Sequence, residues 1–108
     1  PRNLLVERQA KQTAMGDDQM YCCDLCAKKS ADSKFLGTKH IIPLNQGGKD
    51  DIYNLACLCE ECQGRIDRNH VNMARTEQIL SALKRRLYDN YPQYHNVLLT
   101  WFNISDNV

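Results

Sequence analysis

The sequence lacks a long hydrophobic run, a strong charge bias and a low-complexity segment. No stretch approaches the ~20 apolar residues that a membrane-spanning helix needs, so we expect no membrane association. Its 108 residues carry a formal net charge of +1, so the chain as a whole offers no strong electrostatic attraction to nucleic acid. A hydrophobic content of 43% excludes chain-wide disorder. Residues 1–8 lack the apolar core of a secretion signal, which favours a reducing, cytoplasmic location.

Cysteine is the residue type that stands out, with six in the chain. Four of them form two C-x₂-C pairs, with 32 residues between the pairs: Cys23 with Cys26, and Cys59 with Cys62. Together they supply four thiolates, the ligand set of a closed, structural zinc site. Disulfides or redox-active pairs are the alternative. Cys22 and Cys57 are left over, and we predict that both pack as small apolar residues.

Apolar periodicity and turn residues divide the chain into short elements. Strands are predicted at residues 35–42 and 53–58, on either side of a turn-rich loop at 45–51. Residues 27–35 are polar and are predicted to form a surface loop. Helices are predicted within 1–20, at about 60–68 and 73–90, and shortly after Pro92. The basic run 84–86 is expected to be the water-facing side of its helix, with phosphate contact as the alternative.

A specific pattern lies between the two cysteine pairs. It consists of Lys39-His40-Ile41-Ile42-Pro43, then Gly47-Gly48, then Asn54-Leu55, then Leu58 at the second cysteine pair. In order and spacing it resembles the HNH endonuclease family, in the four-cysteine zinc subtype of the ββα-metal (His-Me finger) nucleases. The resemblance implies an α+β fold. A small zinc-stapled ββα-metal module would occupy residues 20–70, with helical extensions at 1–19 and 71–108.

The resemblance also implies roles for individual residues. His40 matches the general base that activates the attacking water, and Asn54 matches the residue that steadies this histidine and the loop. The four paired cysteines match the ligands of the structural Zn²⁺. Two positions depart from the family pattern. Lys39 stands where an acidic residue or histidine usually binds the catalytic metal, and Gln63 stands where a histidine ligand is usual.

Helical spacing suggests a replacement for the missing metal ligands. Gln63, Asp67 and His70 lie at i, i+4 and i+7, on one face of the predicted helix. Gln63 and Asp67 are therefore predicted to hold a catalytic Mg²⁺ or Mn²⁺, because oxygen ligands suit hard cations. The alternative for Asp67 is a solvated surface charge.

DNA is the expected partner. Lys39, Lys49, Arg65 and Arg68 are predicted to contact its phosphates. The C-terminal helices offer a candidate homodimer surface. The sequence therefore predicts a small metal-dependent HNH-type endonuclease that hydrolyses DNA phosphodiester bonds, of the kind that phages and mobile elements encode. The alternative is a catalytically degenerate HNH-like zinc module that binds DNA or a protein partner without cleavage.

Overall fold

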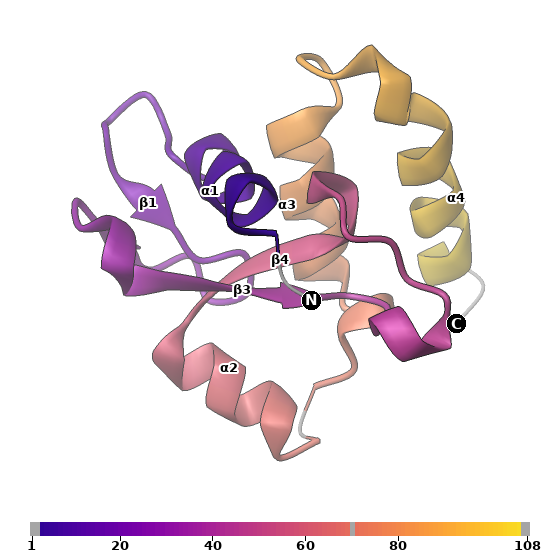
Figure 1. Cartoon of the computed structure of the whole chain (residues 1–108), viewed down its shortest axis with the longest axis horizontal. Helices are drawn as coiled ribbons and strands as arrows, with labels where there is room; N and C mark the ends of the chain where they lie inside the picture. The colour runs from indigo at the N-terminus through magenta and orange to yellow at the C-terminus, as the bar shows by residue number, and fades with distance from the viewer. Residues whose placement is uncertain (1–2, 70, 107–108) are drawn as a thin grey trace.

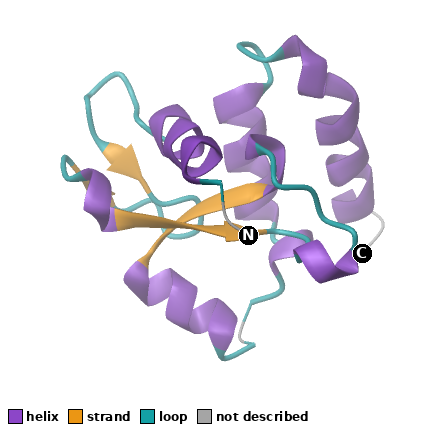
Figure 2. Cartoon of the chain, in the orientation of Figure 1, coloured by secondary structure: helices purple, strands orange, loops and turns teal. Residues whose placement is uncertain are grey.

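Four helices and two small antiparallel sheets make up the described part of the chain (Figure 1; coloured by element type in Figure 2). The computed structural model describes residues 3–69 and 71–106, with side chains described as far as Trp101. The helices are α1 (Leu4–Thr13), α2 (Glu60–Asp67), α3 (Glu77–Leu87) and α4 (His95–Asp106). Strands β1 (Tyr21–Cys22) and β2 (Lys29–Ser30) form one sheet, and β3 (Leu36–His40) and β4 (Leu55–Cys59) form the other. The fold is α+β, as predicted.

The β3–β4 hairpin and α2 form the predicted ββα unit. The two strands pair antiparallel, with Leu36 opposite Cys59 and His40 opposite Leu55. Helix α2 follows β4 directly and lies on one face of this sheet, and α1 covers the other face (Figure 1). Glu60 and Glu61 occupy the first turn of α2, where their negative charge suits the positive end of the helix dipole.

Successive residues of β3 face different helices. Thr38 donates a 2.8 Å hydrogen bond to Glu7 of α1. The Cβ position of Gly37 faces α2 instead, where an added Cβ atom would collide with the side-chain amide of Gln63. Because strand side chains alternate between the two faces, His40 shares the α1 face with Thr38, whereas Lys39 lies on the α2 face.

One hydrophobic core joins the hairpin to the C-terminal helices. Every residue of β4 is buried, which is why its sequence is apolar throughout. Ile79, Leu83 and Leu87, the apolar stripe of α3, belong to the same buried cluster, as do Leu98 and Trp101 of α4. The elements outside the ββα unit therefore complete its core.

Two local predictions are wrong. The surface loop expected at residues 27–35 contains strand β2 and a 3₁₀ turn at Ser33–Phe35. Asn54 lies in the 3₁₀ turn Ile52–Asn54 just before β4, and not on the strand itself. Both elements are too short to leave a periodic pattern in the sequence. Within residues 3–69 and 71–106, no helix is long and apolar enough to cross a membrane.

Candidate functional site

The four cysteines of the two C-x₂-C pairs meet at one point in the fold. Cys23 and Cys26 come from the turn between β1 and β2, and Cys59 and Cys62 come from the junction of β4 and α2. Their sulfur atoms all lie within 4.8 Å of one another, and Cys26 Sγ is 3.7 Å from Cys59 Sγ. Zn–S bonds of about 2.3 Å in a tetrahedron place the sulfurs about 3.8 Å apart, so the cluster fits zinc. All six cysteines are unbridged, which contradicts the disulfide alternative.

Hydrogen bonds hold the first cysteine pair against β4. The Asp24 amide donates to the Cys57 carbonyl, and the Asp24 carboxylate accepts the Cys57 amide, both at 2.8 Å. The Cys59 amide donates to Cys23 Sγ at 3.4 Å. Burial raises the pKa of Cys57 to about 12, so this thiol is a neutral packing residue, as predicted. Cys22 is half-buried and lies outside the four-cysteine cluster.

The buried carboxylate of Asp24 is matched by Arg86 of α3. Arg86 Nη2 donates to Asp24 Oδ2 at 2.8 Å, and its Nη1 donates to the carbonyl of Ala10 and the hydroxyl of Thr13 on α1. Burial is the largest single influence on the pKa of Arg86 and lowers it. The charge of Asp24, the hydrogen bond to Asp24 and other nearby groups together outweigh burial, so the net shift of the pKa is upward and the guanidinium stays charged. The expectation that Arg86 faces water is wrong, whereas its neighbour Arg85 is exposed as predicted.

His40 stands at the end of β3 and pairs with Asp50 from the loop. His40 Nε2 lies 2.9 Å from Asp50 Oδ1, and the two side chains are 20% and 24% exposed. An ionised carboxylate only accepts hydrogen bonds, so it favours the tautomer with the proton on Nε2 and a lone pair on Nδ1. Asp50 was not predicted, because nothing in a turn-rich loop marks which aspartate folds back to the strand.

Asn54 fixes the loop that carries Asp50. Its side-chain Nδ2 donates to the carbonyls of Ile42 and Lys49 at 3.0 and 2.8 Å, and its Oδ1 accepts the Ile42 amide at 2.9 Å. Gly48 packs into this contact, where a Cβ atom would collide with the Ile42 carbonyl. The buried amide of Asn54 therefore clamps both ends of the loop, which supports the steadying role expected for it.

Lys39 and Asp67 form an ion pair on the α2 face. Lys39 Nζ lies 2.6 Å from Asp67 Oδ1, and the side chains are 33% and 61% exposed. Gln63 donates its side-chain amide to the Leu58 carbonyl at 3.1 Å. The structure therefore brings Lys39 to the carboxylate predicted to hold a metal, while His40 lies on the opposite face of the strand.

Gln63 and Asp67 do not fit a divalent cation in this arrangement. An ammonium already neutralises the carboxylate of Asp67, and a Mg²⁺ ion needs about six oxygen ligands. In the described part of the chain, the four cysteines are the only group of three or more His, Cys, Asp or Glu placed to hold a metal. His70, the third residue on the predicted helix face, lies outside the described residues.

The other predicted phosphate contacts are exposed. Lys49 lies in the loop, Arg65 lies on α2, and Arg68 ends that helix. None of the three has an ion-pair partner among the described side chains. Their charges are therefore available to solvent or to an anion, unlike the charge of Lys39.

Comparison with known proteins finds similarity to one family. The sequence model of the HNH endonuclease family matches residues 23–67. This segment begins at the first cysteine of the metal cluster and ends at Asp67, so it spans the whole ββα unit. No curated protein and no solved structure matches the chain.

Proposed function

We propose, from the similarity of residues 23–67 to the HNH endonuclease family, that the protein is a small endonuclease that hydrolyses DNA phosphodiester bonds. The observation that carries the proposal is the pairing of His40 with Asp50, beside a loop clamped by Asn54. A histidine held by a carboxylate at a rigid strand end is suited to proton transfer. The partial exposure of His40 leaves it open to a substrate.

The proposed reaction uses the free nitrogen of His40. A water molecule attacks the phosphorus atom, and Nδ1 of His40 takes its proton as the P–O bond forms. The bond from phosphorus to the 3′ oxygen breaks, and that oxygen takes up a proton from solvent, which leaves a 5′-phosphate and a 3′-hydroxyl. Asp50 stabilises the imidazolium that forms on His40.

The structural support differs between the proposed zinc and the predicted catalytic metal. The cysteine cluster would hold Zn²⁺, whose four thiolates leave no open position for water, so its role is structural. A reducing, cytoplasmic location suits such a site because its thiolates stay unoxidised. For a catalytic Mg²⁺ or Mn²⁺, the predicted ligands Gln63 and Asp67 do not fit while Lys39 neutralises Asp67, so no ligand set is proposed for it. No step of the reaction is assigned to that ion.

A plasmid-nicking assay tests the proposal. Supercoiled plasmid is incubated with the wild-type chain and with His40→Ala in Mg²⁺, Mn²⁺ or EDTA. We expect nicking by the wild type and a loss of about 10²–10⁴-fold in His40→Ala, the usual contribution of a general base. His95→Gln is the matched control, since His95 packs against Tyr88 in the C-terminal segment. Equal nicking rates for wild type and His40→Ala would contradict the proposal.

A second candidate function is a zinc module that binds DNA or a protein partner without cutting it. The observation that favours it is the Lys39–Asp67 ion pair, which occupies the predicted metal ligand. The Lys39→Asp variant separates the two candidates, because it places two carboxylates together and creates oxygen ligands for a divalent ion. If the module is degenerate, the wild type will not nick plasmid in any metal, whereas Lys39→Asp will gain nicking in Mg²⁺ or Mn²⁺.

A homodimer through α3 and α4 is also proposed. The apolar stripe of α3 packs inside the chain, which leaves Leu99 as the exposed large apolar residue among the described side chains of α4. Sedimentation of the wild type beside Leu99→Glu tests this arrangement. A dimer that dissociates in Leu99→Glu supports it, and a monomeric wild type refutes it.

A further inference from the structure

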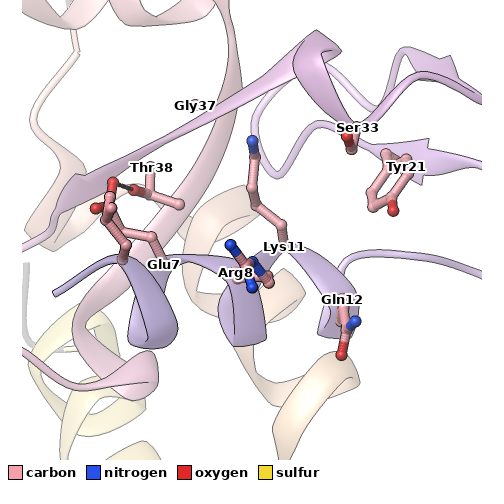
Figure 3. A pocket seen from close by; sticks show the side chains of 9 residues that line it. Glu7, Arg8, Lys11, Gln12, Tyr21, Ser33, Gly37 and Thr38 are labelled. Atoms are coloured by element: carbon pink, nitrogen blue, oxygen red, sulfur yellow. Dashed lines mark hydrogen bonds between the residues drawn. The ribbon is translucent and has the colours of Figure 1, made fainter.

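A polar cleft of about 500 Å³ lies between α1 and β3, outside the residues assigned so far. Gly37 and Thr38 of β3 line it on one side, and Arg8 and Lys11 of α1 line it on the other. Figure 3 shows Lys11 extending from α1 toward β3, with Arg8 beside it. Helix α1 turns these cations toward the sheet because positions i and i+3 share one helix face.

The two cations of the cleft are unpaired. Lys28, Lys29, Lys39 and Arg86 each lie within 3.2 Å of a carboxylate oxygen. Within the described part of the chain, the side chains of Arg8 and Lys11 have neither a hydrogen bond nor an ion pair. Their charges therefore remain available to an anion, whereas the cations paired elsewhere are already neutralised.

The remaining side chains favour an anion as well. Gln12, Tyr21 and Ser33 line the cleft with hydrogen-bond donors that have no partner in the described part of the chain. Glu7, the acidic residue of the lining, is only 9% exposed, and its Oε1 accepts the Thr38 hydroxyl. The cleft thus presents two cations and several neutral donors, which is the chemistry that binds phosphate oxygens.

The cleft also lies close to the candidate base, His40, along strand β3. Thr38 and His40 are two residues apart on β3 and share the α1 face of the sheet. Two residues of a strand span about 6.6 Å. A DNA strand whose scissile phosphate lies at His40 therefore reaches the cleft within one or two nucleotides, since phosphates of one strand advance about 3.4 Å along the duplex axis per base pair.

We propose that this cleft binds the sugar-phosphate backbone of the DNA strand beside His40, with Arg8 and Lys11 contacting its phosphates. The assignment of the strand to His40 rests on the proposed endonuclease function. The contact itself is with phosphate, so it is independent of sequence and salt-sensitive. It gives α1, which lies outside the HNH-type segment, a direct role in substrate binding.

Binding is measured by fluorescence anisotropy of a labelled duplex, in the His40→Ala background and without added Mg²⁺ or Mn²⁺, so that cleavage does not consume the DNA and the cysteine cluster keeps its zinc. Arg8→Gln/Lys11→Gln is compared with Arg75→Gln/Arg85→Gln, whose arginines are exposed and unpaired on the 3₁₀ turn Met73–Arg75 and on α3. Both double variants change the formal net charge from +1 to −1. Glutamine is a good helix former, and the buried residues of α1, Glu7 and Ala10, are untouched.

Arg8→Gln/Lys11→Gln is expected to bind at least tenfold more weakly in 0.15 M salt. Its plot of log affinity against log salt should be shallower by about 1.8, which is about 0.9 for each lost phosphate contact. The control variant should keep the wild-type slope. Equal losses in both variants, or no loss in Arg8→Gln/Lys11→Gln, would overturn the proposal. Because cleavage is blocked throughout, a failure of the endonuclease proposal in the nicking assay leaves this result standing.

Discussion

At the scale of single residues, Asn54 is the side chain on which the loop of the candidate site most depends. Asn54→Ala leaves a backbone amide and two carbonyls without their partner. We expect a loss of about 3 kcal/mol in the free energy of unfolding, because each unsatisfied buried polar group costs about 1–3 kcal/mol. Urea denaturation measures it. The exposed Asn45→Ala should change stability by less than about 0.5 kcal/mol, and equal losses in both would contradict the clamp.

Arg86 supplies a second test at this scale. Arg86→Met leaves the buried Asp24 carboxylate without its counter-charge, and removal of one partner of a buried ion pair typically costs about 3–5 kcal/mol. Its exposed neighbour allows a matched control, Arg85→Met, which should lower the free energy of unfolding by less than about 0.5 kcal/mol. Thermal or urea unfolding compares the two variants. A loss for Arg86→Met no greater than for Arg85→Met would mean that the pair does not hold the cysteine turn in place.

Residues with distinctive chemistry were predictable from sequence, and their partners were not. The metal-binding cysteines come together as their spacing indicates, because two C-x₂-C pairs supply one tetrahedral shell. Asp50 and Asp24 were missed because their partners, His40 and Arg86, lie far along the chain or across a loop. One signal for Arg86 was present: it follows Leu83 by three residues and so falls on the apolar stripe of α3.

At the scale of elements, α2, α3, β3 and β4 were predicted close to their observed positions. Helix α3 was predicted from its apolar periodicity, because it buries one face. Helix α2 was predicted from its place at the second cysteine pair, and the two strands from short apolar segments beside a turn-rich loop. The hairpin of β1 and β2 was missed because strands of two residues show no period. Its pairing depends on the cysteine turn that it carries, which is a tertiary constraint.

The loop and the C-terminal segment are joined by Tyr94. Its hydroxyl donates a 2.7 Å hydrogen bond to Asp51 Oδ1, and this oxygen also caps the 3₁₀ turn that ends at Asn54. We expect Tyr94→Phe to lower the free energy of unfolding at pH 7 by about 1 kcal/mol, the usual net worth of such a bond. Tyr91→Phe is the control, because the Tyr91 hydroxyl has no partner in the described part of the chain.

The same contact predicts a pH dependence. Burial, followed by the hydrogen bond to Asp51, raises the pKa of Tyr94 above its ordinary value of about 10. A raised pKa means that the stabilisation is complete below pH 10 and is lost as the pH rises beyond it, because the unfolded phenol ionises first. The stability difference between wild type and Tyr94→Phe should therefore shrink above pH 10. A difference that stays constant up to pH 11.5 would contradict this account.

At the scale of the whole molecule, the ββα unit shares its core with the segments before and after it. Arg86 of α3 contacts the cysteine turn, the Leu55 carbonyl of β4 and the carbonyl of Ala10 in α1. The family resemblance covered only the middle of the chain, so it could not indicate how the two ends pack. Long-range pairs of this kind arise from tertiary structure and leave no local pattern.

Removal of the metal tests the stability of the whole fold. A structural zinc site contributes about 10–16 kcal/mol of binding free energy to the folded state, so chelation should unfold the module. We expect about one zinc per chain, and loss of both zinc and tertiary circular dichroism in Cys59→Ser. Cys22→Ser, outside the cluster, should retain the metal. A melting temperature unchanged by a strong chelator would contradict the structural role.

The proposed function depends above all on His40, paired with Asp50, as the base of the reaction. This role is measured by the ratio of initial plasmid-nicking rates for wild type and His40→Ala. We expect a ratio of about 10² or more, with folding of the variant verified by its zinc content and circular dichroism. A ratio near one, or no nicking by the wild type in Mg²⁺ or in Mn²⁺, would contradict this role.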